Sequence, residues 1–168
     1  MNLRDEILAE QSKEQAAKIV EWIGSDEKRF GELMRLFLTD VYRVTQRAGW
    51  PLSDAVKQHP GFITPYFPEL LKQLERDDVH IAVKRNVVRL LQFVEVSKRF
   101  EGKIFDACYR LLDDPQEPVA VRVFSMTVAA KIAKDSPELL GELRLVATKY
   151  PDAMTPGFRA RLRHVFGV

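Results

Sequence analysis

The chain has 168 residues, 46% of them hydrophobic and 30% charged, which is enough for one sizeable core and too short for two comfortable domains. Its formal net charge of +2 is mild, so composition neither requires nor excludes nucleic acid as a partner. A single cysteine excludes an intramolecular disulfide, no apolar run approaches the roughly 20 residues of a membrane span, and the first residues lack the apolar stretch of a signal peptide. We therefore expect one domain over residues 1–168, a cytoplasmic location and no membrane contact.

Helix start signals and apolar stripes predict helices along the whole chain. A serine or threonine that can accept a free backbone amide precedes several of them, and in three cases proline follows it directly. These residues are Ser12, Thr64, Ser136 and Thr155. No segment alternates between apolar and polar residues, so we expect no strands. In chain order the predicted helices cover residues 3–11, 13–23, 28–38, 43–58, 62–75, 79–95, 98–112, 118–134, 137–150 and 155–166.

Apolar side chains recur about every 38 residues. One series is Phe30, Phe67, Phe105 and Leu143; a second is Leu33, Leu70, Cys108 and Val146; a third is Phe37, Leu74, Leu112 and Tyr150. Stacked pairs of helices explain all three series, because neither helix of a lone pair buries its apolar stripe without the next pair. The sequence therefore predicts an all-α superhelix, a short α-solenoid of about four helix pairs plus an N-terminal cap.

The segment from Gly49 to Pro68 departs from this pattern, because it holds several prolines and aromatic residues. We expect the helix that begins near Arg43 to kink or break at Trp50–Pro51. Two interpretations stay open: the segment opens a ligand groove, or it packs its aromatic side chains at a junction between repeats. Trp50 accordingly either stacks a base or clamps a peptide side chain beside Arg47, or anchors the kink.

A fourth series is polar and places an arginine near the start of the second helix of each pair. In helical solenoids the second helices commonly line the concave surface, where such arginines would form a ladder. Together with two neighbouring side chains, the ladder is a candidate binding surface for a phosphate backbone or an acidic peptide. The candidate residues are Arg47, Trp50, Arg85, Arg89, Arg122 and Arg161.

The same arginines also have a purely structural interpretation. Each one is predicted to reach a turn carboxylate of its own or the adjacent repeat and so to fix the stacking of the repeats. For Arg85 the carboxylates are Asp77–Asp78, and for Arg122 they are Asp113–Asp114. The sequence does not separate a binding surface from a structural ladder.

The sequence supplies no set of residues for catalysis or for metal binding. The three histidines lie far apart, without a second ligand at helical spacing. Cys108 falls in an apolar series, so we expect a buried and unreactive thiol. Phosphate-binding loops, nucleophile elbows and Cys-x-x-Cys motifs are missing from the sequence. We therefore expect no catalytic residue, no metal and no cofactor.

Three motifs carry a resemblance to known proteins: Arg47-Ala48-Gly49-Trp50, Ser125-Met126-Thr127, and Tyr150-Pro151 followed by Phe158-Arg159-Ala160-Arg161-Leu162-Arg163-His164-Val165. They resemble a group of small bacterial HEAT-like helical-repeat proteins of unassigned function, from about Phe30 to the end of the chain. The resemblance implies a HEAT-like α-α superhelix. Some members are labelled adenylosuccinate lyase, but the serine- and glycine-rich run that precedes Met-Pro in those lyases has no counterpart in this sequence.

A looser resemblance is to the HEAT-like DNA glycosylases that excise alkylated bases from duplex DNA. Those enzymes place an acidic residue and tryptophans against the lesion, and Trp50 with Asp54 is the local pair that matches them here.

These observations favour a non-enzymatic scaffold that binds a protein partner through the surface of its second helices. The alternative is nucleic-acid binding through the arginine ladder, with base excision as its most specialised form. Ionic strength separates the two, because phosphate binding weakens steeply as salt rises.

Overall fold

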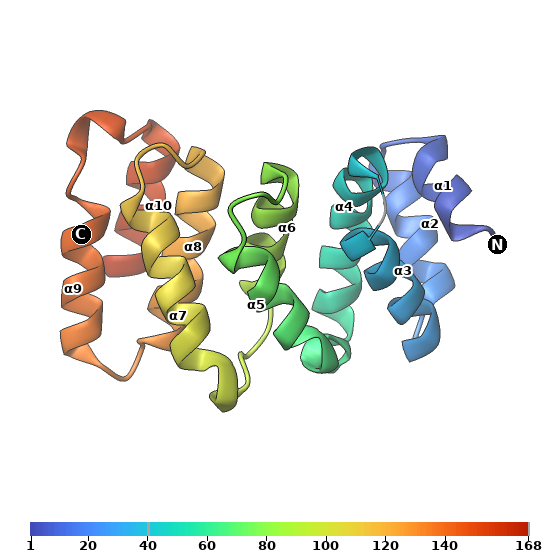
Figure 1. Cartoon of the computed structure of the whole chain (residues 1–168), viewed down its shortest axis with the longest axis horizontal. Helices are drawn as coiled ribbons and strands as arrows, with labels where there is room; N and C mark the ends of the chain where they lie inside the picture. The colour runs from blue at the N-terminus through green and yellow to red at the C-terminus, as the bar shows by residue number, and fades with distance from the viewer. Residues whose placement is uncertain (40, 168) are drawn as a thin grey trace. The chain divides into compact units, whose positions relative to one another are not determined.

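The computed structural model describes residues 1–39 and 41–167, which form ten α-helices, two short 3₁₀ helices and no strand (Figure 1). The predicted all-α fold is therefore confirmed. Within the described residues, no helix has both the length and the apolar character that crossing a bilayer requires. The elements are α1 (Leu3–Ala9), α2 (Lys13–Ile23), α3 (Glu27–Thr39), α4 (Tyr42–Gln58), η1 (Pro60–Tyr66), α5 (Phe67–Glu75), α6 (Ile81–Leu91), α7 (Lys98–Asp113), α8 (Val119–Ile132), α9 (Pro137–Ala147), η2 (Pro151–Ala153) and α10 (Pro156–Phe166).

The chain divides into two compact units, Met1–Glu95 and Val96–Val168. In the first unit α4 packs against both α2 and α6, while α3 lies on α4 and α5 lies on α6. In the second unit α7 and α8 form the main pair, α9 contacts both of them, and α10 packs on α8. We call α4, α6, α8 and α10, which carry the arginine series, the second helices. That residues 1–168 make one domain stays a prediction.

The apolar series form the core of both units. Their members are buried in the structure, except for Phe105 and Tyr150, which are half-buried. Phe30, Phe67 and Leu112 are at most 1% exposed, so the recurring positions do face neighbouring helices. Cys108 is also fully buried, as the sequence predicted.

Three of the four predicted helix starts are capped as expected. The hydroxyl of Ser12 accepts the Gln15 amide at 3.1 Å, and those of Ser136 and Thr155 accept amides three residues on, at 3.4 and 3.2 Å. The prediction for Thr64 is wrong, because Thr64 lies inside η1 and α5 begins later, at Phe67. The prolines at both ends of residues 60–65 fix φ and remove amide donors, which suits a short 3₁₀ helix better than an α-helix.

Of the kink or break predicted at Trp50–Pro51, the break is wrong, because α4 continues as an α-helix from Tyr42 to Gln58, and the kink stays a prediction. Pro51 removes one amide donor from the helix, but it is buried, as are Leu52 and Ser53 after it. Burial on both sides of the proline holds the helix together despite the lost hydrogen bond.

Candidate functional site

Arg47, the first arginine of the series, is engaged inside its own unit. Its side chain projects from α4, is half-buried, and donates from Nη1 to the backbone carbonyl of Leu8 at 2.7 Å. Leu8 lies in the last turn of α1, where carbonyls have no partner within the helix. A guanidinium at this position also interacts favourably with the negative end of the helix dipole. Arg47 thus fixes the short N-terminal helix to α4.

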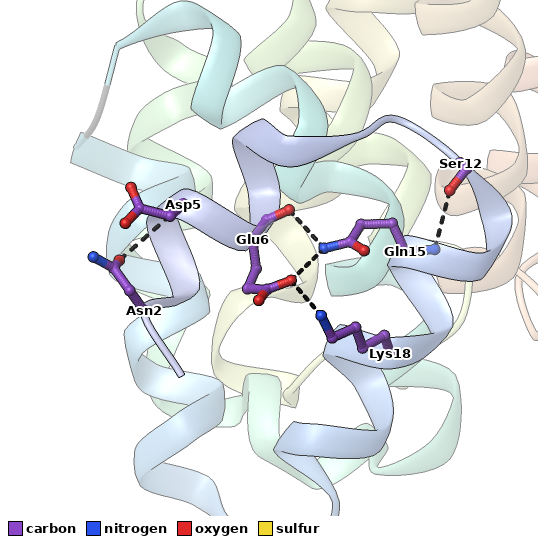
Figure 2. A network of polar contacts seen from close by, with 6 residues as sticks. All are labelled: Asn2, Asp5, Glu6, Ser12, Gln15 and Lys18. Atoms are coloured by element: carbon purple, nitrogen blue, oxygen red, sulfur yellow. Dashed lines mark hydrogen bonds and ion pairs between the residues drawn. The ribbon is translucent and has the colours of Figure 1, made fainter.

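A second set of polar contacts holds α1 against α2 (Figure 2). Glu6 on α1 faces Gln15 and Lys18 on α2: Gln15 Nε2 donates to its carboxylate at 2.7 Å and to its backbone carbonyl at 2.8 Å. Lys18 Nζ donates to the same carboxylate oxygen at 2.7 Å. Beneath these contacts Leu3 and Ile7 are buried, so both an apolar face and the polar contacts of Glu6 hold α1 in place.

We expect the docking of α1 to weaken in acid. The hydrogen bonds from Lys18 and then Gln15 lower the pKa of Glu6 from its ordinary value of 4.5. The carboxylate therefore stabilises docked α1 above pH 4.5, and this stabilisation is lost as pH falls through the lowered pKa. Hydrogen exchange of the α1 amides, expressed as protection relative to the intrinsic exchange rate at each pH, should show weaker protection at low pH in the native chain and a flatter profile in Glu6→Gln. Identical profiles in the two proteins would contradict a contribution of the Glu6 carboxylate to the docking of α1.

Trp50 lines a small crevice in the described part of the chain. It is half-buried, and the crevice, of about 10 Å³, is also lined by Arg47 and α2 residues such as Ala16 and Ile19. That volume barely holds one water molecule, so neither a base nor a peptide side chain fits. Asp54 does not share this crevice: its carboxylate binds Lys57 Nζ at 2.8 Å and borders a separate hollow.

The separate hollow lies between α2 and α4 and has a volume of about 450 Å³. Ala17 and Val20 form its apolar part, while Glu21, Asp54 and Gln58 supply its polar atoms. Its two carboxylates suit a cationic side chain and do not suit a phosphate.

Arg122 does not belong to an exposed surface. It is 1% exposed and projects from α8, with Nε donating to the carbonyl of Leu112 at 3.0 Å and the guanidinium 4.9 Å from the ring centroid of Phe158. One nitrogen, Nη2, has no hydrogen-bond partner in the described residues. In the described residues no hydrogen bond joins Arg122 to Asp113 or Asp114, and Asp113 binds Lys149 Nζ at 2.8 Å, although both carboxylates attract the guanidinium electrostatically.

Burial lowers the pKa of Arg122, because the cost of desolvation outweighs the attraction of Asp114, Tyr150 and Asp113. We expect Arg122→Met to keep the packing on Phe158 and to change the free energy of unfolding by less than about 1 kcal/mol, because the removed charge offsets the lost hydrogen bond. Arg122→Ala should cost about 3 kcal/mol, since it leaves a cavity. Urea unfolding of both variants measures the difference. Equal losses in the two variants would show instead that the charge itself stabilises the fold.

Arg161 links two of the motifs that carry the family resemblance. It projects from α10, and its Nη1 donates to the hydroxyl of Thr127 on α8 at 2.7 Å. Phe158, from the same C-terminal motif, is fully buried. In the first unit Arg47 and Gly49 of the remaining motif likewise contact other parts of the chain. The motif residues described here thus account for packing within each unit.

Arg85 and Arg89 are the two candidate residues whose guanidinium groups have no polar partner in the described part of the chain. Both project from α6; Arg85 is exposed and Arg89 is half-exposed. The predicted pairing of Arg85 with Asp77 or Asp78 is not found, because Arg76 binds Asp78 through two hydrogen bonds of 2.8 and 2.9 Å. The structural interpretation therefore fails for Arg85, although a carboxyl-rich turn lies close to it in sequence.

Sequence analysis missed an exposed apolar cluster beside Arg85. Val41 and Ile81 are 60% and 38% exposed, and Tyr42, at 47%, lies against the exposed ring of His80 with ring centroids 3.9 Å apart. We call Val41, Tyr42, His80 and Ile81 the Tyr42 patch. Tyr42 and His80 are 38 residues apart, so the spacing of the repeats does contain the signal that brings them together. His80 also caps α6, its Nδ1 accepting the Ala82 amide at 3.0 Å.

The described residues hold no cluster of His, Cys, Asp and Glu side chains that could bind a metal ion. Burial raises the pKa of the Cys108 thiol to about 12, so very little thiolate exists at neutral pH. The groups gathered at the surface of α4 and α6 are guanidinium, aromatic and aliphatic ones.

Comparison with known proteins agrees with the helical-repeat architecture. The sequence matches the HEAT repeat domain over residues 3–167. No curated protein and no solved structure matches the chain. The match spans both units and includes all the helices described above, so the predicted resemblance is confirmed and the chain belongs to the HEAT repeat family.

Proposed function

We propose that the chain is a non-enzymatic scaffold that binds a protein partner through the surface of its second helices, and that α6 is central to that surface. The observation that carries the proposal is the state of Arg85 and Arg89, which have no intramolecular partner for their guanidinium groups among the described residues. Exposed cations that contribute nothing to packing are available to a ligand. HEAT repeats commonly use such helical surfaces to hold other proteins.

A protein partner fits the surface better than a nucleic acid does. Phosphate binding gains affinity from each additional cation along the strand, so an arginine ladder needs all its members at the surface. Arg122 is buried and Arg47 is bound to the Leu8 carbonyl, which leaves the ladder interrupted. The exposed aliphatic side chains of the Tyr42 patch add contacts that suit a protein and offer nothing to phosphates.

Site-specific photo-crosslinking tests this proposal. A benzoylphenylalanine that replaces the exposed Tyr42 beside α6 keeps Arg85 and Arg89 in place and should capture a defined protein in extracts of the source cell, while the same probe at Lys28, an exposed residue of α3, should not. Equal capture from both positions, or capture from neither, would contradict a partner surface on α6.

Mobility-shift assays with duplex and single-stranded DNA address the alternative. We expect no shift at physiological salt. A salt-sensitive shift that disappears in the double variant Arg85→Ala, Arg89→Ala would overturn the proposal in favour of nucleic acid. The double variant should melt within about 2 °C of the native chain, because neither guanidinium has a polar partner to lose.

A further inference from the structure

The Tyr42 patch differs from the other exposed apolar side chains of the described residues. Those others are single: Met1 lies at the terminus, Phe93 is covered by Lys57 Nζ at 4.5 Å from its ring centroid, and Leu139 and Leu145 lie on α9. The patch instead gathers two aliphatic and two aromatic side chains from the starts of α4 and α6, which pack directly against each other. Exposed apolar and aromatic side chains that gather at one place on a surface often mark an interaction site.

Cationic side chains lie next to the patch in the sequence, and Arg85 also shares a helix face with Ile81. Arg43 follows Tyr42 on α4 and is exposed, and Arg85 lies one helical turn beyond Ile81 on the same side of α6. Neither α4 nor α6 has an acidic residue in its first turn, whereas α3 and α5 carry Glu27 and Glu69 in their first turns.

Acidic groups do occur nearby in the sequence, but they leave the charge next to the patch cationic. Asp78 is engaged by Arg76 at 2.8 Å, and Asp40 lies outside the described residues. Asp77 is the exposed carboxylate that remains in the loop before α6. Its single negative charge is outnumbered by the two positive charges of Arg43 and Arg85. The charge next to the patch therefore complements a negatively charged ligand.

The apolar part of the patch selects among negatively charged ligands. One face of the Tyr42 ring is already occupied by His80, and Val41 and Ile81 offer no aromatic face on which a base could stack. Aliphatic side chains beside guanidinium groups match a peptide that alternates apolar residues with carboxylates.

We infer that the Tyr42 patch binds an acidic peptide segment of the partner, with an apolar side chain on Val41 and Ile81 and carboxylates on Arg43 and Arg85. This inference rests on the proposed protein-binding function and specifies where the partner binds and what its chemistry is. The binding is non-covalent, and the carboxylates act through charge-assisted hydrogen bonds to guanidinium groups.

A displayed library of random peptides, selected on the whole chain, tests the inference. We expect enrichment of peptides in which aspartate or glutamate flanks an aromatic or aliphatic residue. Measured by fluorescence anisotropy, one such synthetic peptide should bind about tenfold more weakly to Arg85→Glu and to Ile81→Ser than to the native chain. Lys28→Glu, the same charge change on an exposed residue of α3, should leave the affinity unchanged. Exchanging the peptide carboxylates for lysines should restore binding to Arg85→Glu.

The outcomes separate this inference from the broader proposal. The selected peptides could bind Arg85→Glu and Ile81→Ser as tightly as they bind the native chain. That result would contradict binding at the Tyr42 patch and would leave a scaffold that binds its partner elsewhere. If the selected peptides lacked carboxylates, the inference that the partner segment is acidic would be wrong. Concentration-dependent dimerisation that Ile81→Ser abolishes, with no peptide selected, would assign the patch to a second copy of the chain and overturn the inference. A library that yields no binder, combined with a salt-sensitive DNA shift, would overturn the proposed function as well.

Discussion

Replacing Leu112 by aspartate is expected to unfold the unit Val96–Val168. Leu112 is fully buried on α7, the helix that packs most extensively against α8, and its carbonyl accepts the hydrogen bond from Arg122. A carboxylate there would lose its hydration in an apolar core, and the contacts of the leucine side chain between α7 and α8 would be lost with it, at a cost of more than about 4 kcal/mol. That cost is a large part of the stability of a small domain. Circular dichroism should show a marked loss of helix, and limited proteolysis should cleave within α7 and α8.

Lys103→Asp is the matched control for this change, because Lys103 lies on the same helix and is exposed. It introduces the same residue without burying it, so we expect the variant to melt within a few degrees of the native chain. If Leu112→Asp instead gave a protein that melts cooperatively at the native temperature, the assignment of the third apolar series to the core would be wrong.

Gly49→Ala is expected to cost about 3 kcal/mol, although alanine usually stabilises a helix relative to glycine. A Cβ added at Gly49 would lie 2.6 Å from Oδ1 of Asn86 and closer still to the Cγ and Nδ2 atoms of the same side chain. Asn86 is 3% exposed and projects from α6, so the amide has no free space into which it can move. The substitution therefore pushes α4 and α6 apart where they pack together. Thermal melting and urea denaturation measure the loss.

A second substitution tells this steric effect from a general effect of alanine. Asn86→Ala removes the amide, whose Nδ2 has no hydrogen-bond partner in the described structure, and should rescue Gly49→Ala by more than about 1.5 kcal/mol. Gly102→Ala is the control, because Gly102 lies in α7 with no atom within 4 Å of an added Cβ. It should stabilise the chain by about 0.5–1 kcal/mol. Lack of rescue in the double variant would mean that the close approach of Gly49 to Asn86 does not limit the packing of α4 on α6.

The core was predictable from the sequence because repetition makes the same side chain meet the same neighbours. Phe30 and Phe67, for example, occupy equivalent positions in successive repeats, and both are 1% exposed. Phe105 is the equivalent residue in the next repeat, yet it is only half-buried and lies beside Tyr109 with ring centroids 6.1 Å apart. It lies in the second unit, where different helices surround it.

The contacts of the arginine side chains could not be predicted from the same spacing. An arginine has a long flexible stem, so the position of its Cα leaves open which of several groups its guanidinium reaches. Arg47 donates to a carbonyl at a helix end, and Arg122 donates to a carbonyl beside a buried phenylalanine. Arg85 has no polar partner among the described residues. These differences depend on where the neighbouring helices end, and helix ends are what a sequence pattern locates least well.

Local sequence signals failed where packing across the unit opposed them. Pro51 was expected to kink or break its helix, and α4 continues through it without a break because Pro51 itself and Gly49, Leu52 and Ser53 around it are buried. The exposed pair of Tyr42 and His80 was missed for a related reason, since apolar periodicity finds the buried face of a helix and gives no weight to aromatic side chains at helix starts.

The buried thiol of Cys108 makes the chain a convenient host for spectroscopic labels. Maleimide and other electrophilic dyes react with thiolates, and a fully buried thiol with a pKa near 12 offers them almost none at neutral pH. Because it is the only cysteine in the sequence, new cysteines introduced at exposed positions can be labelled while Cys108 stays in place. Donor and acceptor dyes placed on Lys28 of the first unit and Lys103 of the second would then report the distance between the units by energy transfer, with and without a bound peptide.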